Sequence, residues 1–238
     1  MPANRTIPHC LTCERRAQGL FCAFKNSHLL KLDCKKVTKH YKRGQAIFYE
    51  GTPAAAIYCI YSGTVKLYKV GRDDQEVVIR LLRAGDIIGY RPLLAGELFS
   101  ATAQVVEDTT VCTITKETFF DLIRQNPDLG MRLMSKLATE LRVSEDQLVV
   151  RVLESVPQRT ARFLVWLLNG SLAEATDRPS VDVPLRRDEM AQIIGTTPET
   201  LSRVLKDFKR RRIIDVDRRL MTVRKPLQLQ RISDHGIS

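Results

Sequence analysis

The sequence has no long apolar run, and this absence argues against a membrane-spanning protein. None of its apolar stretches approaches the roughly 18 residues that a membrane-spanning helix needs. The opening residues, MPANRTIPHC, also lack an apolar stretch after a basic start. No secretory signal is therefore expected, and the cytoplasm is the expected location.

Motifs of common enzyme classes are missing as well. There is no P-loop, no Gly-x-Ser-x-Gly, no His-Glu-x-x-His and no pair of carboxylates in a pattern typical of a catalytic cleft. The sequence therefore predicts a protein that is not an enzyme. Its length of 238 residues allows one large domain or two modest ones.

Acidic residues are scarce relative to basic ones. The chain has 27 Asp and Glu against 38 Lys and Arg, and its formal net charge is +11 at pH 7. Residues 186–231 alone hold 13 basic and 6 acidic side chains, a net charge of +7. A basic block of this size favours a polyanionic partner, most simply double-stranded DNA. A solvated surface is the alternative on charge alone.

Short apolar runs separated by glycines fill residues 41–120. They are rich in β-branched and aromatic side chains, which is typical of antiparallel strands in a barrel or sandwich. The runs are AIFYE, AIYCIYSGTVKLYKV, EVVIRLL, ATAQVV and TVCTI, and GRDDQE is the predicted tip of a hairpin. Residues 1–40 are cysteine-rich and basic and show little periodicity.

A long helix is predicted from Asn126-Pro127 to about Val152. Proline is favoured at the first helical position, and apolar residues then recur with a mostly heptad spacing. A small barrel cannot bury so long a stripe, so a helix from a second chain is the favoured partner, and packing within one chain is the alternative. Pro157 is predicted to end the helix. The predicted dimer contacts are Met134, Leu137, Leu141, Leu148 and Val152.

The C-terminal part has the pattern of a helix-turn-helix. A helix is predicted over 158–169, then a polar loop over 170–180, a short strand in VDVPL and a second helix in RRDEMAQII. Gly195 closes a tight turn, Thr197 is a candidate N-cap and Pro198 begins a third helix. Two strands in IIDVDRRLMTVRK would form a small wing.

The segment TTPETLSRVLKDFKRRRII has one apolar face, formed by Leu201, Val204, Leu205 and Phe208 at helical spacing. Its other face mixes charges in a way that suits the major groove, where arginine can donate to guanine and glutamate can accept from cytosine. An acid favoured by the helix dipole is the alternative for Glu199. The predicted base-reading residues are Glu199, Ser202 and Arg203, and the predicted phosphate contacts are Thr196, Thr197, Lys206, Arg186 and Lys209 with the basic run 209–212.

These segments resemble the CRP/FNR family of bacterial transcription regulators over essentially the whole chain. The resemblance lies in KRGQAIFYEGTPAAAIYCIYSGTVKLY, LLRAGDIIGYRPLLAGE, the long helix and RRDEMAQIIGTTPETLSRVLKDFKRRRII. It implies an α+β fold with a β-roll like that of cyclic-nucleotide-binding jelly rolls, a dimerisation helix and a winged helix-turn-helix. The implied divisions are a cysteine-rich segment 1–40, the β-roll 41–125, the dimerisation helix 126–156 and the DNA-binding domain 157–238.

The resemblance also implies a homodimer that meets RNA polymerase and places two recognition helices about 34 Å apart on DNA. The spacing Glu199-x-x-Ser202-Arg203 is similar to that of the FNR branch. It implies an inverted repeat whose half-sites contain TTGAT.

A cyclic nucleotide is one candidate signal, but its expected ligands are altered. The family holds the cyclic phosphate with a Gly-Glu pair and a later Arg-Ser-Ala, whereas Tyr90 and Phe99 replace the glutamate and the arginine here. A buried phosphate would lack its charge partner, so cyclic AMP is disfavoured. The candidate pocket for any small ligand is Gly89, Tyr90, Arg91, Ser100 and Ala101.

An iron–sulfur cluster is the second candidate. FNR-type sensors hold a four-iron–four-sulfur (4Fe-4S) cluster with three N-terminal cysteines and one from the β-roll. The resemblance assigns these places to Cys10, Cys13, Cys22 and Cys112, with Cys34 as a possible substitute. The gap of eight residues between Cys13 and Cys22 is longer than in FNR itself.

Other roles for the six cysteines remain open. In the cytosol they are more typical of metal sites, redox groups or the core than of structural disulfides. Zinc could be held by Cys10, Cys13, Cys22 and Cys34, and a dithiol redox switch without metal is a further alternative. Cys59 is predicted to be a core thiol.

Overall fold

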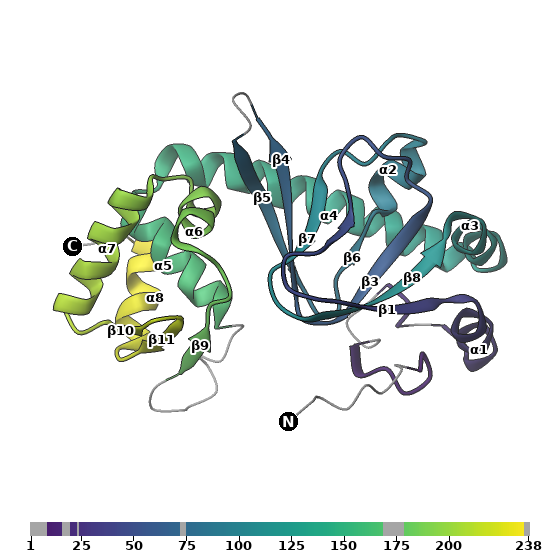
Figure 1. Ribbon diagram of the computed structural model, residues 1–238, viewed down its shortest axis with the longest axis horizontal. Coiled ribbons are helices and arrows are strands. Elements are labelled where there is room, and N and C mark those ends of the chain that lie inside the picture. Colours follow the sequence, from purple (N-terminus) through teal and green to yellow (C-terminus); the bar gives the residue numbers. More distant parts are fainter. Residues whose placement is uncertain (1–8, 16–19, 23, 72–74, 169–178, 236–238) are drawn as a thin grey trace. The chain divides into compact units, whose positions relative to one another are not determined.

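The computed structural model describes residues 9–15, 20–22, 24–71, 75–168 and 179–235 (Figure 1). The chain forms two compact units, residues 1–139 and 140–238. Within the described part of the chain, no helix has the length and apolarity needed to cross a membrane.

The first unit is built on two four-stranded antiparallel sheets, which confirms the predicted β-roll. The sheet orders are β1-β8-β3-β6 and β2-β7-β4-β5. All five predicted apolar runs form strands, and the tip of the predicted hairpin between β4 and β5 lies outside the described residues at 72–74. The strands are β1 Val37–Tyr41, β2 Ala46–Phe48, β3 Ala56–Ser62, β4 Thr64–Val70, β5 Glu76–Arg83, β6 Ile87–Ile88, β7 Thr102–Val105 and β8 Thr109–Thr115.

Three helices of this unit were not predicted by the periodicity. They are α1 Asn26–Lys35, α2 Tyr90–Ala95 and α3 Lys116–Gln125. Figure 1 shows α1 and α3 at the same end of the unit, and the two helices are in contact. Each is too short for its apolar residues to stand out as a repeating pattern.

The predicted boundary between the cysteine-rich segment and the β-roll, at residue 40, is wrong. Strand β1 of the β-roll already begins at Val37. Before it, Leu20, Phe21 and Leu32 are buried in one cluster with Ile57 of β3 and Phe119 of α3. The described part of the cysteine-rich segment therefore belongs to the first unit, because its apolar residues complete that unit's core.

A 27-residue helix, α4 Pro127–Leu153, confirms the predicted long helix. Its first turns bury Leu129 and Leu133, and Leu137 is partly buried against the same core. The other four predicted interface residues are exposed: Met134 by 57%, Leu141 by 62%, Leu148 by 65% and Val152 by 82%.

Pro157 does not end this helix, contrary to the prediction. Helix α4 ends at Leu153, and Pro157 lies in the first turn of α5, which spans Val156–Leu167. Ser155 caps α5, because the Gln158 side chain accepts a hydrogen bond from the Ser155 N–H at 2.9 Å and the Gln158 N–H approaches Ser155 Oγ at 3.5 Å. Proline suits this position because the first N–H groups of a helix have no partner within it.

The second unit contains the predicted helix-turn-helix and wing. Its elements are α5, β9 Ser180–Asp182, α6 Arg187–Ile194, α7 Pro198–Arg210, β10 Ile214–Asp217, β11 Leu220–Val223 and α8 Pro226–His235. The wing has three strands in the order β10-β11-β9, so the predicted strand in VDVPL joins it. Helix α8 was not predicted. Residues 169–178, the end of the predicted helix and most of the predicted polar loop, lie outside the described part.

Candidate functional site

The turn between α6 and α7 is set by three residues that the sequence singles out. Gly195 ends α6 in the left-handed region with φ 75°. Thr197 caps α7, and its Oγ1 accepts a hydrogen bond from the Thr200 N–H at 3.3 Å. Pro198 is the first residue of the helix. The local sequence therefore fixes where α7 starts.

Helix α7 buries one face and exposes the other. Leu201, Val204, Leu205 and Phe208 are all buried, as their spacing predicts. On the opposite side Glu199 and Arg203 are exposed and Ser202 is half-buried. The Arg203 guanidinium donates to Thr200 Oγ1 at 3.3 Å, which holds it along the first turns of the helix. This face presents a donor, an acceptor and a hydroxyl to solvent.

The predicted phosphate contacts lie around this face. Thr197, Lys206 and Lys209 are exposed, and Thr196 is half-buried. Arg186 is also exposed, but its guanidinium already pairs with Asp188 at 3.0 Å and Glu189 at 3.8 Å. Arg186 would have to exchange these partners to reach a phosphate.

Arg159 of α5 is a positioning residue that the sequence reasoning missed. Its guanidinium donates to the carbonyl oxygens of Ile194 at 2.8 Å and Gly195 at 3.0 Å, and also to that of Glu154. These bonds fix the turn between α6 and α7 to helix α5. Only a basic residue on a largely apolar helix marks this role in the sequence.

The turn of the wing between β10 and β11 carries Arg218 and Arg219, which are exposed. Arg218 has a positive φ of 51°. Paired arginines in a two-residue turn were a readable signal for a further phosphate contact, and the sequence reasoning did not use it.

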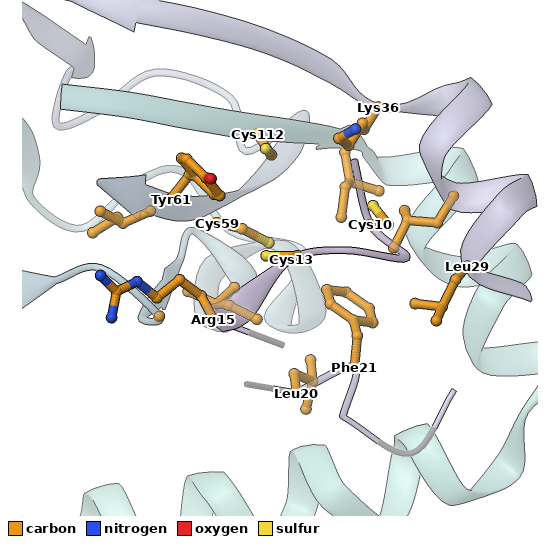
Figure 2. Close-up of a pocket in the computed structure, with 15 residues that line it drawn as sticks. Cys10, Cys13, Arg15, Leu20, Phe21, Leu29, Lys36, Cys59, Tyr61 and Cys112 are labelled. Atoms are coloured by element: carbon orange, nitrogen blue, oxygen red, sulfur yellow. The ribbon is translucent and has the colours of Figure 1, made fainter. Parts of the chain in front are cut away.

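A second candidate site is a cavity in the first unit that four cysteines line (Figure 2). They are Cys10, Cys13, Cys59 and Cys112. Cys10 and Cys13 come from the N-terminal segment, Cys59 from β3 and Cys112 from β8. Much of the remaining wall is apolar, including Leu20, Phe21, Leu29, Leu32, Ile60, Ile87 and Ile114.

The structure brings together three of the four predicted cluster ligands but not the fourth. Cys22 is not among the residues that line the cavity, and its Sγ accepts a hydrogen bond from Arg132 of α4 at 3.0 Å. Cys34 is exposed on α1. Cys59, predicted to be a core thiol, is half-buried and faces the cavity.

The cavity disfavours charged sulfur in the absence of a bound group. Burial raises the pKa of Cys10 to about 12 and also raises the pKa values of Cys59 and Cys112. Lys36 lies in the wall and opposes this effect for Cys10 and Cys112. All three are therefore protonated thiols at neutral pH.

Asp33 anchors the N-terminal segment beside the cavity. Its carboxylate accepts hydrogen bonds from the Cys10 N–H at 2.9 Å, from His9 Nδ1 at 2.9 Å and from Lys36. Burial works to raise the pKa of Asp33, but these donors, Lys36 foremost, hold it below its ordinary value.

Within the described residues, no three His, Cys, Asp or Glu side chains are arranged to hold a single metal ion. A tetrahedral zinc site would need thiolates about 2.3 Å from one point. A four-iron cluster is larger than an ion, so its ligands stand farther apart. Two of the four cysteines predicted for zinc, Cys22 and Cys34, do not line the cavity with Cys10 and Cys13.

The five residues predicted for a small-ligand pocket lie in different environments. The Tyr90 side chain is buried in the core, whereas Arg91 and Ser100 are exposed. Phe99 stacks on Phe48 with ring centroids 3.9 Å apart. Gly89 has φ 84°, and an added Cβ would lie 3.0 Å from the Ala56 carbonyl oxygen. Tight packing thus explains the glycine. Ala101 is buried.

Comparison with known proteins agrees with both units. The family model of the cyclic nucleotide-binding domain matches residues 38–126, and that of the Crp-like helix-turn-helix domain matches residues 158–232. The cyclic AMP receptor protein of Thermus thermophilus is 31% identical over 193 residues, which cover 81% of this chain and 86% of that protein. The chain belongs to the CRP/FNR family.

Other matches also cover most of the chain. The fumarate and nitrate reduction regulatory protein of Escherichia coli is 25% identical over 228 residues, which cover 95% of this chain and 91% of that protein. The solved structure of FixK2 from Bradyrhizobium japonicum shares the fold with a TM-score of 0.72 at 22% identity, covering 82% of this chain and 96% of that one. Members of this family are transcription regulators that bind DNA and act as dimers. The protein is accordingly a DNA-binding regulator of the CRP/FNR type.

Proposed function

We propose that this protein regulates transcription as a homodimer that reads an inverted repeat with α7 and responds to an iron–sulfur cluster held by its cysteines. The observation that carries the DNA-reading part is the exposed face of α7. It combines Glu199, Ser202 and Arg203 on a helix whose other face is fully buried. We expect the protein to act in the cytoplasm and to contact RNA polymerase there.

The exposed side of α4 supports the homodimer. Met134, Leu141, Leu148 and Val152 are each more than half exposed, although apolar residues at heptad spacing are usually buried against a partner helix. A second copy of the same helix would cover them and would place two recognition helices on one face of the DNA, about 34 Å apart.

Three side chains of α7 have distinct proposed roles in the major groove. Arg203 donates two hydrogen bonds to a guanine, Glu199 accepts from a cytosine amino group, and Ser202 contacts thymine or phosphate. Such a set suits half-sites like the TTGAT element of the FNR branch. The proposed phosphate contacts are Thr196, Thr197, Lys206, Arg186, Lys209, Arg218 and Arg219.

The proposed signal acts through an iron–sulfur cluster, and the cysteines of the first unit support this proposal. Cys10, Cys13 and Cys112 face one largely apolar cavity, and soft sulfur donors suit iron. When bound, a 4Fe-4S cluster would supply a centre that oxygen or nitric oxide can destroy. Cys22 would be the fourth ligand if it released Arg132, and Cys34 is the exposed substitute. Zinc, a dithiol or a small ligand in the β-roll are the competing signals, and cyclic AMP is disfavoured.

Binding-site selection tests the proposed DNA reading. Arg203→Ala should relax the preference at one guanine of each half-site, because a bidentate contact is worth about 1–3 kcal/mol of discrimination. Lys209→Ala is the matched control on the same helix. It should weaken binding to all sequences alike and reduce the salt dependence by about one counterion. An unchanged base preference in Arg203→Ala would overturn the assignment.

Anaerobic purification tests the cluster. Iron and acid-labile sulfide near four per chain, with a broad absorption that bleaches in air, are the expected results. A colourless protein without iron would overturn the cluster and leave the DNA-binding assignment standing, since the two rest on different residues.

A further inference from the structure

Cys59 and Cys112 lie directly opposite each other on neighbouring strands. They are register partners in the antiparallel pair β3 and β8. Side chains of opposed residues in an antiparallel pair point to the same face of the sheet, and both cysteines line the same cavity (Figure 2). The sheet itself therefore holds the two thiols together, independently of the N-terminal segment.

This placement meets the main geometric condition for a disulfide. Opposed residues in antiparallel strands have Cα atoms about 4.5–5.5 Å apart, depending on whether the pair is hydrogen-bonded. Disulfides span Cα separations of about 4.4–6.8 Å. A side-chain rotation can thus bring the sulfur atoms together without moving the strands. Cys59 is only half-buried, so a small oxidant can reach the pair from the cavity.

We propose that a peroxide converts Cys59 and Cys112 into a cross-strand disulfide when the cavity holds no cluster. One thiol, as its thiolate, attacks a peroxide oxygen. An S–O bond forms, the O–O bond breaks, and the other peroxide oxygen leaves as hydroxide, which takes up the thiol proton and becomes the first water. The second thiol then attacks the sulfenic sulfur, the S–S bond forms and a second water departs. Two thiols and one hydrogen peroxide give one disulfide and two waters.

Burial opposes the first step, because both thiols favour the protonated form. The pairing is therefore slower than oxidation of an exposed thiol. It also competes with the N-terminal cysteines, since Cys10 and Cys13 face the same cavity. The fixed register of β3 and β8 favours the strand pair, because Cys10 and Cys13 lie outside regular secondary structure.

The disulfide would have a regulatory consequence that rests on the proposed cluster. Cys112 is the only proposed ligand that a strand supplies, and a sulfur atom in a disulfide cannot serve as a thiolate ligand. Oxidation of the pair would thus keep the empty regulator from taking up a new cluster until a reductant restores the thiols.

Thiol mapping on the full-length, metal-free protein tests the pair. The protein is reduced, freed of reductant, treated with hydrogen peroxide, alkylated and digested with trypsin. Trypsin separates the two cysteines because Lys66, Lys69 and Arg83 lie between them. The expected result is a cross-linked peptide that carries Cys59 and Cys112, with the loss of two alkylatable thiols per chain.

Two variants and one control make the outcome decisive. Cys59→Ala and Cys112→Ala should each abolish the cross-link, and Cys34→Ala should leave it intact because Cys34 lies exposed on α1. Full alkylation of both cysteines after peroxide, or a dominant cross-link to Cys10 or Cys13, would overturn the proposal. Iron analysis of the untreated protein is read separately, so that a failed cluster and a failed disulfide give different results.

Discussion

Replacing Arg159 by methionine should loosen the helix-turn-helix without changing which bases it prefers. The guanidinium of Arg159 donates to three backbone carbonyls, those of Glu154, Ile194 and Gly195. Two of these belong to the turn that sets the angle between α6 and α7. Methionine keeps much of the aliphatic stem and removes all three donors.

The size of the effect follows from the environment of this side chain. A hydrogen bond from a charged donor contributes about 1.5–3 kcal/mol when it is well buried. Arg159 is half-buried, and water can replace some of its bonds, so the total loss is about 2 kcal/mol in the free energy of unfolding. If the turn must be restored before α7 enters the groove, DNA affinity should fall by up to about 30-fold.

Equilibrium denaturation measures the loss of stability, and fluorescence anisotropy measures the loss of DNA affinity. Anisotropy is recorded with a specific duplex and with a scrambled duplex, and the ratio of the two affinities should stay constant. Arg162→Met is the matched control, because Arg162 bonds to Glu154 and to the Ser233 carbonyl but not to the turn. Unchanged stability and affinity in Arg159→Met, or a changed base preference, would refute the positioning role.

Two further predictions concern the dimer and the N-terminal anchor. Leu148→Glu should shift the protein towards monomer in sedimentation and weaken binding to the full inverted repeat. The control Gln147→Glu, one position away, should leave the dimer intact. A stable Leu148→Glu dimer would refute the proposed interface. The pKa of Asp33 is lowered in the folded protein, so its stabilisation is present above the ordinary carboxyl pKa of about 3.9 and is lost as the pH falls through the folded value. Denaturation across pH 5 to pH 2 should show this loss in the wild type and less of it in Asp33→Asn, and equal pH profiles would contradict the anchoring role.

The sequence predicted those parts of the fold that depend on local pattern. Short apolar runs separated by glycines predicted strands β2, β3, β4, β5, β7 and β8 but not β1 and β6. Heptad spacing predicted α4, and Gly195 with Thr197 and Pro198 predicted the turn before α7. These features could be read because hydrophobic periodicity and capping depend on residues close together in the chain.

Three short helices of the first unit and the long-range partners could not be read in this way. Helices α1, α2 and α3 have ten residues or fewer, too few for their apolar residues to repeat clearly. The carbonyls that Arg159 bonds in the turn are 35 and 36 residues away, and no local pattern indicates them.

The cysteines show most clearly what the sequence determines and what only the tertiary structure decides. The sequence alone determined that a Cys-x-x-Cys pair precedes a β-roll and that a basic helix follows a tight turn, since these are facts of spacing and charge. Only the tertiary structure decided that Cys59 faces the cavity with Cys10, Cys13 and Cys112 and that Cys22 lies against α4. The reason is strand register. Cys59 and Cys112 are 53 positions apart, and it is the pairing of β3 with β8 that sets them side by side.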